Sequence, residues 1–334
     1  MPAFEEFKRK FRVLVTHDRL GGQAVAMLQG RDIDVIFSPA YAPPAEVAER
    51  VGRYEVDALI VRQGKVTEAV VAASRRLRVI AKHGVGVDNI DLSAAAARKI
   101  PVVRGMGSNA RAVAELSMTL SLALLKELPR LDLAVKAGQW PKPSFIGRDI
   151  SRTVIGLVGF GSIGQEVARM AVALGMRVII HDPHAQDAIN AFDAGAAREL
   201  GTLLSECDIL SLHVPLTKGT RHLIGAKRIR LMKPGAYIVN TARGGLVDEL
   251  ALAQALQDGH IGGAGLDTFQ EEPPAADNPL WSAPNLLATP HVAGVTAASS
   301  AAMAELAARQ VIDILYGAPP DPRHLVDPAE LAAS

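Results

Sequence analysis

Three polar side chains of different chemical type follow apolar runs in the second half of the sequence. Arg243 comes shortly after AYIVN, Glu272 after GAGLD, and His291 after LLAT. An imidazole exchanges protons near neutral pH, and a neighbouring carboxylate stabilises its protonated form and orients the ring. A guanidinium holds a carboxylate through paired hydrogen bonds that a lysine could not imitate. Together the three could bind a small organic acid and move a proton at its hydroxyl group.

An earlier glycine-rich segment has the pattern of a dinucleotide-binding turn. Gly159, Gly161 and Gly164 form GFGSIG between the strand pattern TVIGLV and the helix pattern SIGQEVARMAVALG. The first glycine allows a tight bend, the second admits a pyrophosphate, and the third lets the helix pack on the strand. The start of the helix offers N–H groups to the phosphates. Asp182, 18 residues after Gly164, would bind the adenosine ribose and repel a 2′-phosphate, so NAD is expected rather than NADP.

The elements that must position these groups form two series of alternating strand and helix patterns, which predict βαβ units on parallel sheets. Ligands of such sheets bind at the carboxyl ends of the strands, where all three polar side chains fall. The strand patterns are RVLVTH from Arg12, DVIF from Asp34, DALIV from Asp57, RVIA from Arg78 and PVV from Pro101, and then TVIGLV from Thr153, RVIIH from Arg177, DILSLHV from Asp208, AYIVN from Ala236, GAGLD from Gly263 and LLAT from Leu286.

Two helix patterns set the expected domain boundaries. The segment from Asn109 to Lys126 predicts one long, largely buried helix that links the two series. An alanine-rich helix pattern from Ala297 to Tyr316 has no strand after it, so we expect it to pack back on the first series. We therefore predict one domain from residues 1–106 and 296–334 and a second from residues 107–295, each a doubly wound α/β parallel sheet.

Composition narrows the classes of partner. The 36 basic and 35 acidic residues give a formal charge of +1, which argues against nucleic acid or an anionic membrane as a partner. The lone Cys207, in an expected buried strand, cannot form an intramolecular disulfide, and the N-terminus lacks a signal-peptide pattern, so a cytoplasmic location is expected. The most apolar stretch, residues 116–125, is too short to span a bilayer. No His, Cys or carboxylate spacing indicates a metal site.

In motif content and order the chain resembles the D-isomer-specific 2-hydroxyacid dehydrogenase family. Besides the glycine turn, the resemblance covers KHGVGVDNID at 82–91, HVPLT at 213–217, NTARGGLVDE, GLDTFQEEP and ATPH. It implies that residues 107–295 form a NAD-binding Rossmann domain and that the remainder forms a flavodoxin-like substrate domain. It also implies a homodimer built through the coenzyme domains.

The resemblance assigns a role to each matching residue. Arg243 would bind and polarise the substrate, Glu272 would support His291, and His291 would transfer the proton. Backbone at Val85 and Gly86 would receive the substrate carboxylate. The implied cofactor-binding residues, among which Asp267 would touch the nicotinamide carboxamide, are Gly159, Gly161, Ser162, Ile163, Gly164, Asp182, Val214, Pro215, Thr241, Ala242, Asp267 and Gly294.

The resemblance is to a family with several substrates. Members acting on phosphoglycerate often carry an arginine-serine segment at the third strand and a threonine-proline pair after PVV. Here the two segments read VRQGKVT and VRGMGSN, which disfavours phosphoglycerate, although Arg62, Lys65 and Arg104 could serve an anionic tail. Formate dehydrogenases of the family pair the histidine with glutamine, so Glu272 argues against formate. The alternative function is an NAD(H)-sensing interaction protein like the family's transcriptional corepressors.

Overall fold

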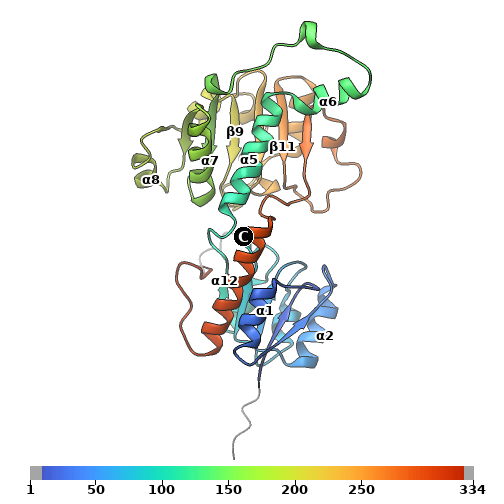
Figure 1. The fold of residues 1–334 in the computed structure, drawn as a ribbon, viewed down its shortest axis with the longest axis vertical. Helices are drawn as coiled ribbons and strands as arrows, with labels where there is room; N and C mark the ends of the chain where they lie inside the picture. Colours follow the sequence, from blue (N-terminus) through green and yellow to red (C-terminus); the bar gives the residue numbers. More distant parts are fainter. Residues whose placement is uncertain (1–9, 327–334) are drawn as a thin grey trace, which may run out of the picture. The chain divides into compact units, whose positions relative to one another are not determined.

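The computed structural model describes residues 10–326, which form two compact units (Figure 1). One unit contains the described residues up to Asn109 and those from Val295 onward. The other unit contains Ala110–Gly294. The chain therefore leaves the first unit, builds the second, and returns.

The first unit is a five-stranded parallel sheet with strand order β2-β1-β3-β4-β5. Strand β3 is buried at every position, as expected of a parallel sheet covered on both faces. The helix expected to return to this sheet does so, since α12 packs on α1 and β4 (Figure 1). The elements are β1 (Phe11–Val15), α1 (Gly22–Gln29), β2 (Ile33–Phe37), α2 (Pro44–Tyr54), β3 (Ala58–Val61), α3 (Glu68–Ala72), β4 (Val79–Lys82), α4 (Leu92–Ala97), β5 (Val102–Val103) and α12 (Ala297–Leu315).

The second unit is a seven-stranded parallel sheet with order β12-β11-β10-β9-β6-β7-β8. Strand β6 comes first in the chain and lies between β7 and β9, so the strand order reverses at this point. Ligands of doubly wound sheets bind at such a switch point. The elements are α5 (Ala110–Leu125), α6 (Leu128–Lys136), η1 (Lys142–Ser144), η2 (Ile150–Arg152), β6 (Val154–Val158), α7 (Ser162–Ala173), β7 (Arg177–His181), α8 (Gln186–Asn190), β8 (Gly195–Ala197), α9 (Leu200–Glu206), β9 (Ile209–Leu212), α10 (Ala226–Ile229), β10 (Ala236–Asn240), η3 (Gly244–Leu246), α11 (Glu249–Gln257), β11 (Ile261–Leu266), η4 (Pro279–Ser282) and β12 (Leu286–Ala288).

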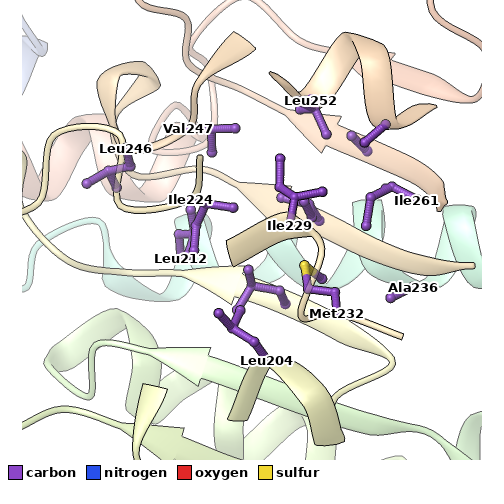
Figure 2. Close-up of a cluster of buried hydrophobic side chains, with 14 of the residues drawn as sticks. Leu204, Leu212, Ile224, Ile229, Met232, Ala236, Leu246, Val247, Leu252 and Ile261 are labelled. Atoms are coloured by element: carbon purple, nitrogen blue, oxygen red, sulfur yellow. The ribbon is translucent and has the colours of Figure 1, made fainter. Parts of the chain in front are cut away.

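Two apolar cores cover the faces of this second sheet. Helices α5 and α7 pack against one face, with Leu157 and Val239 in their core. On the other face, α11 and the segment before it pack on β9, β10 and β11 (Figure 2). Leu246, Val247 and Leu252 point into this second core and fix the start of α11. The polar segments that follow β10 and β11 are therefore attached to a rigid layer.

The two parallel-sheet domains predicted from the sequence are confirmed, with corrections at single elements. Cys207 is buried as expected, but it lies at the end of α9, and strand β9 starts only at Ile209. The edge strand β8, with the sequence GAA, and the helix α6 were not predicted. Within residues 10–326, no helix combines the length and apolar character needed to cross a membrane.

Candidate active site

The glycine turn joins β6 to α7, and its three glycines meet different surroundings. Gly159 has φ of +99°, and a Cβ there would come within 2.5 Å of the His213 carbonyl oxygen. A Cβ on Gly164 would lie 2.3 Å from the Gly159 carbonyl oxygen. A Cβ on Gly161 would meet no atom within 4 Å. The first and third glycines are thus required by packing, whereas the second leaves open space where a phosphate could approach the backbone.

Asp182, directly after β7, is tied to the glycine turn. One carboxylate oxygen accepts a 2.8 Å hydrogen bond from the N–H of Phe160, and the other accepts a 2.9 Å bond from the N–H of His184. The N-cap of α7 is Gly161, which has no side chain to occupy the first N–H groups of the helix. These groups and the open space at Gly161 fit a dinucleotide pyrophosphate.

His291 and Glu272 are in direct contact. The Nδ1 atom of His291 lies 2.7 Å from Glu272 Oε2, and Glu272 Oε1 accepts a 3.1 Å bond from the N–H of Phe269. Burial alone would raise the pKa of Glu272, but the hydrogen bond with His291 and the charges of His291 and Arg243 lower it overall. Glu272 is therefore ionised at neutral pH. Both side chains are partly exposed, so Nε2 of His291 remains available to a ligand.

Asp267 holds the segment that carries His291. Its carboxylate is fully buried and accepts bonds from Thr289 Oγ1 at 2.6 Å, from the N–H of Val292 at 2.9 Å and from the N–H of Ala293 at 2.8 Å. Its carbonyl oxygen accepts a 2.8 Å bond from the N–H of His291. Asp267 thus fixes the backbone on both sides of the imidazole. Its contact with the nicotinamide carboxamide stays a prediction.

Arg243 lies in the turn after β10. Asn240, fully buried, donates its Nδ2 hydrogen to the Arg243 carbonyl at 2.8 Å and accepts a 3.1 Å bond from the N–H of Ala242. Directly after Arg243, a Cβ on Gly244 would lie 1.9 Å from the carbonyl carbon of Phe269. The turn with Arg243 therefore packs directly against the turn with Glu272. The positive charge of Arg243 helps to lower the pKa of the Glu272 carboxylate.

The remaining predicted residues of this unit also follow strand ends. Thr241 is buried, and its hydroxyl lies 2.7 Å from that of Ser117 in α5. The other residues in this group are Ser162 and Ile163 at the start of α7, Val214 and Pro215 after β9, Ala242 after β10, and Gly294 at the end of the unit. Val85 and Gly86 follow β4 in the first unit, and their contact with the substrate stays a prediction.

Four supporting residues were missed by the sequence analysis. Asn240 and Ser117 hold the β10 turn, and Glu249, which is buried at the start of α11, binds the Glu272 loop. Near the glycine turn, burial lowers the pKa of His213 to about 4, and its Nε2 lies 3.0 Å from Ser211 Oγ. A polar residue that ends or follows a buried strand was the available signal for Asn240 and His213.

Comparison with known proteins identifies the relatives of this chain. Residues 118–293 match the model described as the D-isomer specific 2-hydroxyacid dehydrogenase, NAD binding domain. A (S)-sulfolactate dehydrogenase of Chromohalobacter salexigens is 45% identical over 247 residues, which cover 72% of this chain and 79% of that one. A D-3-phosphoglycerate dehydrogenase of Methanocaldococcus jannaschii is 38% identical over 301 residues, 85% of this chain but only 57% of the relative's length.

A solved structure agrees with these matches. The crystal structure of the TT0316 protein from Thermus thermophilus superposes with a TM-score of 0.84 at 36% identity and covers 95% of this chain and 100% of that one. The family model covers more than half of the chain and includes the glycine turn, Arg243, Glu272 and His291. The second unit is accordingly an NAD-binding domain, and the chain belongs to the D-isomer specific 2-hydroxyacid dehydrogenase family.

Proposed function

We propose that the protein transfers a hydride between NAD(H) and C2 of a small D-2-hydroxy acid or the corresponding 2-keto acid. The observation that carries the proposal is the 2.7 Å contact between His291 and Glu272, because it lies at the same sheet edge as the glycine turn and in the same unit. A supported imidazole is the proton donor and acceptor that such a reaction needs.

Each side chain has a distinct role in this proposal. Bound NAD(H) supplies or receives the hydride. His291, whose Nδ1 is occupied by Glu272, uses Nε2 to take the hydroxyl proton during oxidation and to return it during reduction. Arg243 binds the substrate carboxylate and polarises the carbonyl oxygen. Backbone at Val85 and Gly86, together with the first unit as substrate domain, completes the proposal for carboxylate binding.

The proposed substrate is a small 2-hydroxy acid; 3-phosphoglycerate is disfavoured, and so is formate, which is not a 2-hydroxy acid. One relative is named for sulfolactate and another for phosphoglycerate, so the family match alone leaves the tail of the acid open. The segment VRQGKVT lacks the arginine-serine pair, and the histidine partner is Glu272 rather than glutamine. These two features disfavour phosphoglycerate and formate, and the names of other relatives make hydroxypyruvate, glyoxylate and sulfopyruvate the first keto acids to test.

A panel of 2-keto acids assayed with NADH and NADPH tests the proposal. We expect turnover with at least one small acid and a preference for NADH. His291→Asn should lower kcat by about 10²- to 10⁴-fold, the usual contribution of a general acid or base. Arg243→Gln should raise KM for the acid because it removes the fork that holds the carboxylate, and it should also lower kcat because the carbonyl oxygen loses the charge that polarises it.

The matched control is His260→Gln. His260 precedes β11 and therefore lies at the opposite edge of the sheet, where its Nε2 contacts the Ile229 carbonyl oxygen at 3.0 Å. Activity should survive this change. If NADH binds but no acid in the panel is turned over, the sensing alternative replaces the enzyme.

We also propose a homodimer that forms through the second units. Support comes from exposed apolar side chains on α6 and on the segment after it, namely Leu128, Leu133, Val135, Trp140 and Ile146. Three of these side chains lie on the single helix α6, and apolar side chains that gather on a surface often mark an interface.

A further inference from the structure

The exposed loop after β11 must hold Glu272 in a fixed position. Between Gln270 and Asp277 it is largely exposed, yet it carries Glu272, which must stay within 2.7 Å of His291. Exposed loops sample many conformations unless their backbone is tied down. In this loop, hydrogen bonds to a buried side chain hold the backbone in place.

Glu249, the first residue of α11, holds both ends of the loop. Its side chain is buried, and Oε1 accepts a 2.6 Å bond from the N–H of Gln270, while Oε2 accepts a 2.7 Å bond from Asn278 Nδ2. Asn278 in turn caps η4 by accepting a 3.0 Å bond from the N–H of Leu280. One carboxylate therefore joins two points that flank Glu272 on either side.

The attachment point itself is rigid. Leu246, Val247 and Leu252 hold the start of α11 in the core beneath it (Figure 2), and Phe269 and Leu280 from the loop enter the same core. A buried carboxylate that loses its donors keeps the full cost of desolvation, so the protein resists moving either donor away.

The link to the proposed catalytic pair runs through two successive peptide groups, which share the α-carbon of Phe269. The N–H of Phe269 donates to Glu272, and the next N–H, that of Gln270, donates to Glu249. Gly244 packs against the second of these peptide groups, because a Cβ there would lie 2.4 Å from the Gln270 nitrogen. Glu249 therefore fixes the peptide group next to the one that donates to Glu272, beside the turn with Arg243.

We propose that Glu249 is a positioning residue that sets the Glu272–His291 contact by clamping Gln270 and Asn278. It touches neither of the two reacting side chains and acts only through the loop. The inference rests on the proposed function for its kinetic consequences, but its structural consequence can be read without any turnover.

The first test uses Glu249→Gln, which keeps the shape of the side chain. The new amide nitrogen replaces one acceptor oxygen, so an N–H group faces the N–H group of Gln270 or Asn278. We expect kcat/KM for the keto acid to fall about tenfold or more while the Kd for NADH stays within about twofold, because a misplaced acid–base pair is costly and the glycine turn is unchanged. Glu271→Gln, an exposed neighbour in the same loop, is the control and should keep both values.

A second readout follows the imidazole directly. With Nδ1 bonded to Glu272, the neutral ring keeps its hydrogen on Nδ1, since the partner of one ring nitrogen sets the tautomer. In ¹⁵N-histidine-labelled protein, with the His291 signals assigned by His291→Asn, Glu249→Gln should shift the ring towards the Nε2–H tautomer. A failure of the proposed function would leave wild-type turnover absent but this shift intact.

A rescue variant separates positioning from general damage. Combining Glu249→Gln with Asn278→Asp reverses the donor and acceptor of one bond, so the new amide donates to the new carboxylate while its oxygen still accepts from Gln270. The pair should recover most of the lost kcat/KM and the Nδ1–H tautomer. Wild-type kinetics and tautomer in Glu249→Gln, or a double variant no better than the single one, would overturn the proposal.

Asn278→Asp alone covers the case in which Glu249→Gln does not fold. It places two carboxylates in contact and should reproduce the loss of kcat/KM and the tautomer shift. A folded Asn278→Asp protein with wild-type values contradicts the clamp.

Discussion

At the scale of single residues, His291 adopts a backbone conformation that few side chains adopt. Its φ is +54°, in the left-handed region, where a residue other than glycine is held only if its surroundings require it. Asp267 holds the backbone in this conformation, because its carboxylate and carbonyl oxygens accept four hydrogen bonds from residues 289–293. The imidazole is thus aimed by a buried neighbour from a different strand end.

Replacing Asp267 by asparagine tests this arrangement. The new amide nitrogen would replace one carboxylate oxygen and face one or two of the three donors, so at least one hydrogen bond is lost and a buried group is left unsatisfied. We expect unfolding to become easier by about 1–3 kcal/mol, and kcat/KM to fall about tenfold or more as His291 loosens. Thermal melting and steady-state kinetics measure the two effects. Asp277→Asn, at an exposed position, should change neither value, and a wild-type melting temperature for Asp267→Asn would contradict the role.

A second residue-scale prediction concerns pH and His213. Burial lowers its pKa from 6.5 to about 4, and its Nδ1 has no hydrogen-bond partner within residues 10–326. Between these two pH values the unfolded chain binds a proton that the folded chain does not bind. The contribution of neutral His213 to the free energy of unfolding is therefore fully present above about pH 6.5. This contribution is lost as the pH falls towards 4, by up to about 1.4 kcal/mol per pH unit.

Urea unfolding followed by tryptophan fluorescence measures this effect. The only two tryptophans, Trp140 and Trp281, both lie in the same unit as His213. We expect His213→Asn to be less stable at neutral pH but to show a shallower fall between pH 6.5 and 4. The exposed His184→Asn should keep the wild-type slope. An unchanged slope in His213→Asn would assign the pH dependence to other groups.

Among the elements of the second unit, the β6–α7 turn contains two glycines with different roles, Gly164 in packing and Gly161 in the proposed binding of NADH. Gly164→Ala places a Cβ 2.3 Å from a backbone oxygen, so α7 must move and the unit should lose several degrees of melting temperature. Gly161→Ala meets no protein atom, so the melting temperature should stay close to wild type while affinity for NADH falls about tenfold or more. Calorimetry and NADH titration distinguish the two variants.

The control for this pair is Gly201→Ala in α9, which also meets no protein atom and is far along the chain from the turn. It should stabilise the helix slightly, by about 0.5–1 kcal/mol, and leave NADH binding unchanged. A Gly161→Ala protein that binds NADH as tightly as wild type would show that the open space is not used by the pyrophosphate.

Elements with strong local patterns could be predicted from the sequence, and those set by distant contacts could not. The strand before the glycine turn is buried at every position, so its apolar run was a clear signal. Strand β8 consists of GAA at a sheet edge and has no such run. The three polar residues after strand ends could be predicted because parallel strands end at one edge. The Glu249 clamp and the buried Asp267 depend on pairs 20 or more residues apart, for which the sequence carries no local sign.

At the scale of the whole molecule, the first unit is assembled from both ends of the described chain. Helix α12, which follows the entire second unit, contributes Ala304, Ala308 and Val311 to the core that also contains α1. The second unit is continuous and holds the glycine turn, the contact between His291 and Glu272, and Arg243. The proposed chemistry is thus concentrated in one unit, which leaves the proposed substrate domain to set the identity of the acid.

The exposed apolar residues of the second unit predict the oligomeric state of the protein. Ile146 is 91% exposed, Trp140 is 70% exposed and Leu133 is 67% exposed. Covering them against a second copy would remove this area from water, at a gain of about 25 cal/mol per Å². We therefore expect the wild-type protein to sediment at about twice its 35.3 kDa mass.

The double variant Leu133→Asp with Ile146→Asp should sediment near 35.3 kDa at micromolar concentration, because each buried carboxylate would lack a partner in the interface. Tyr41→Asp is the matched control, since Tyr41 is 72% exposed but lies in the first unit. It should remain dimeric. A wild-type protein that sediments as a monomer would remove the dimer from the proposal, and a double variant that stays dimeric would move the interface to another surface.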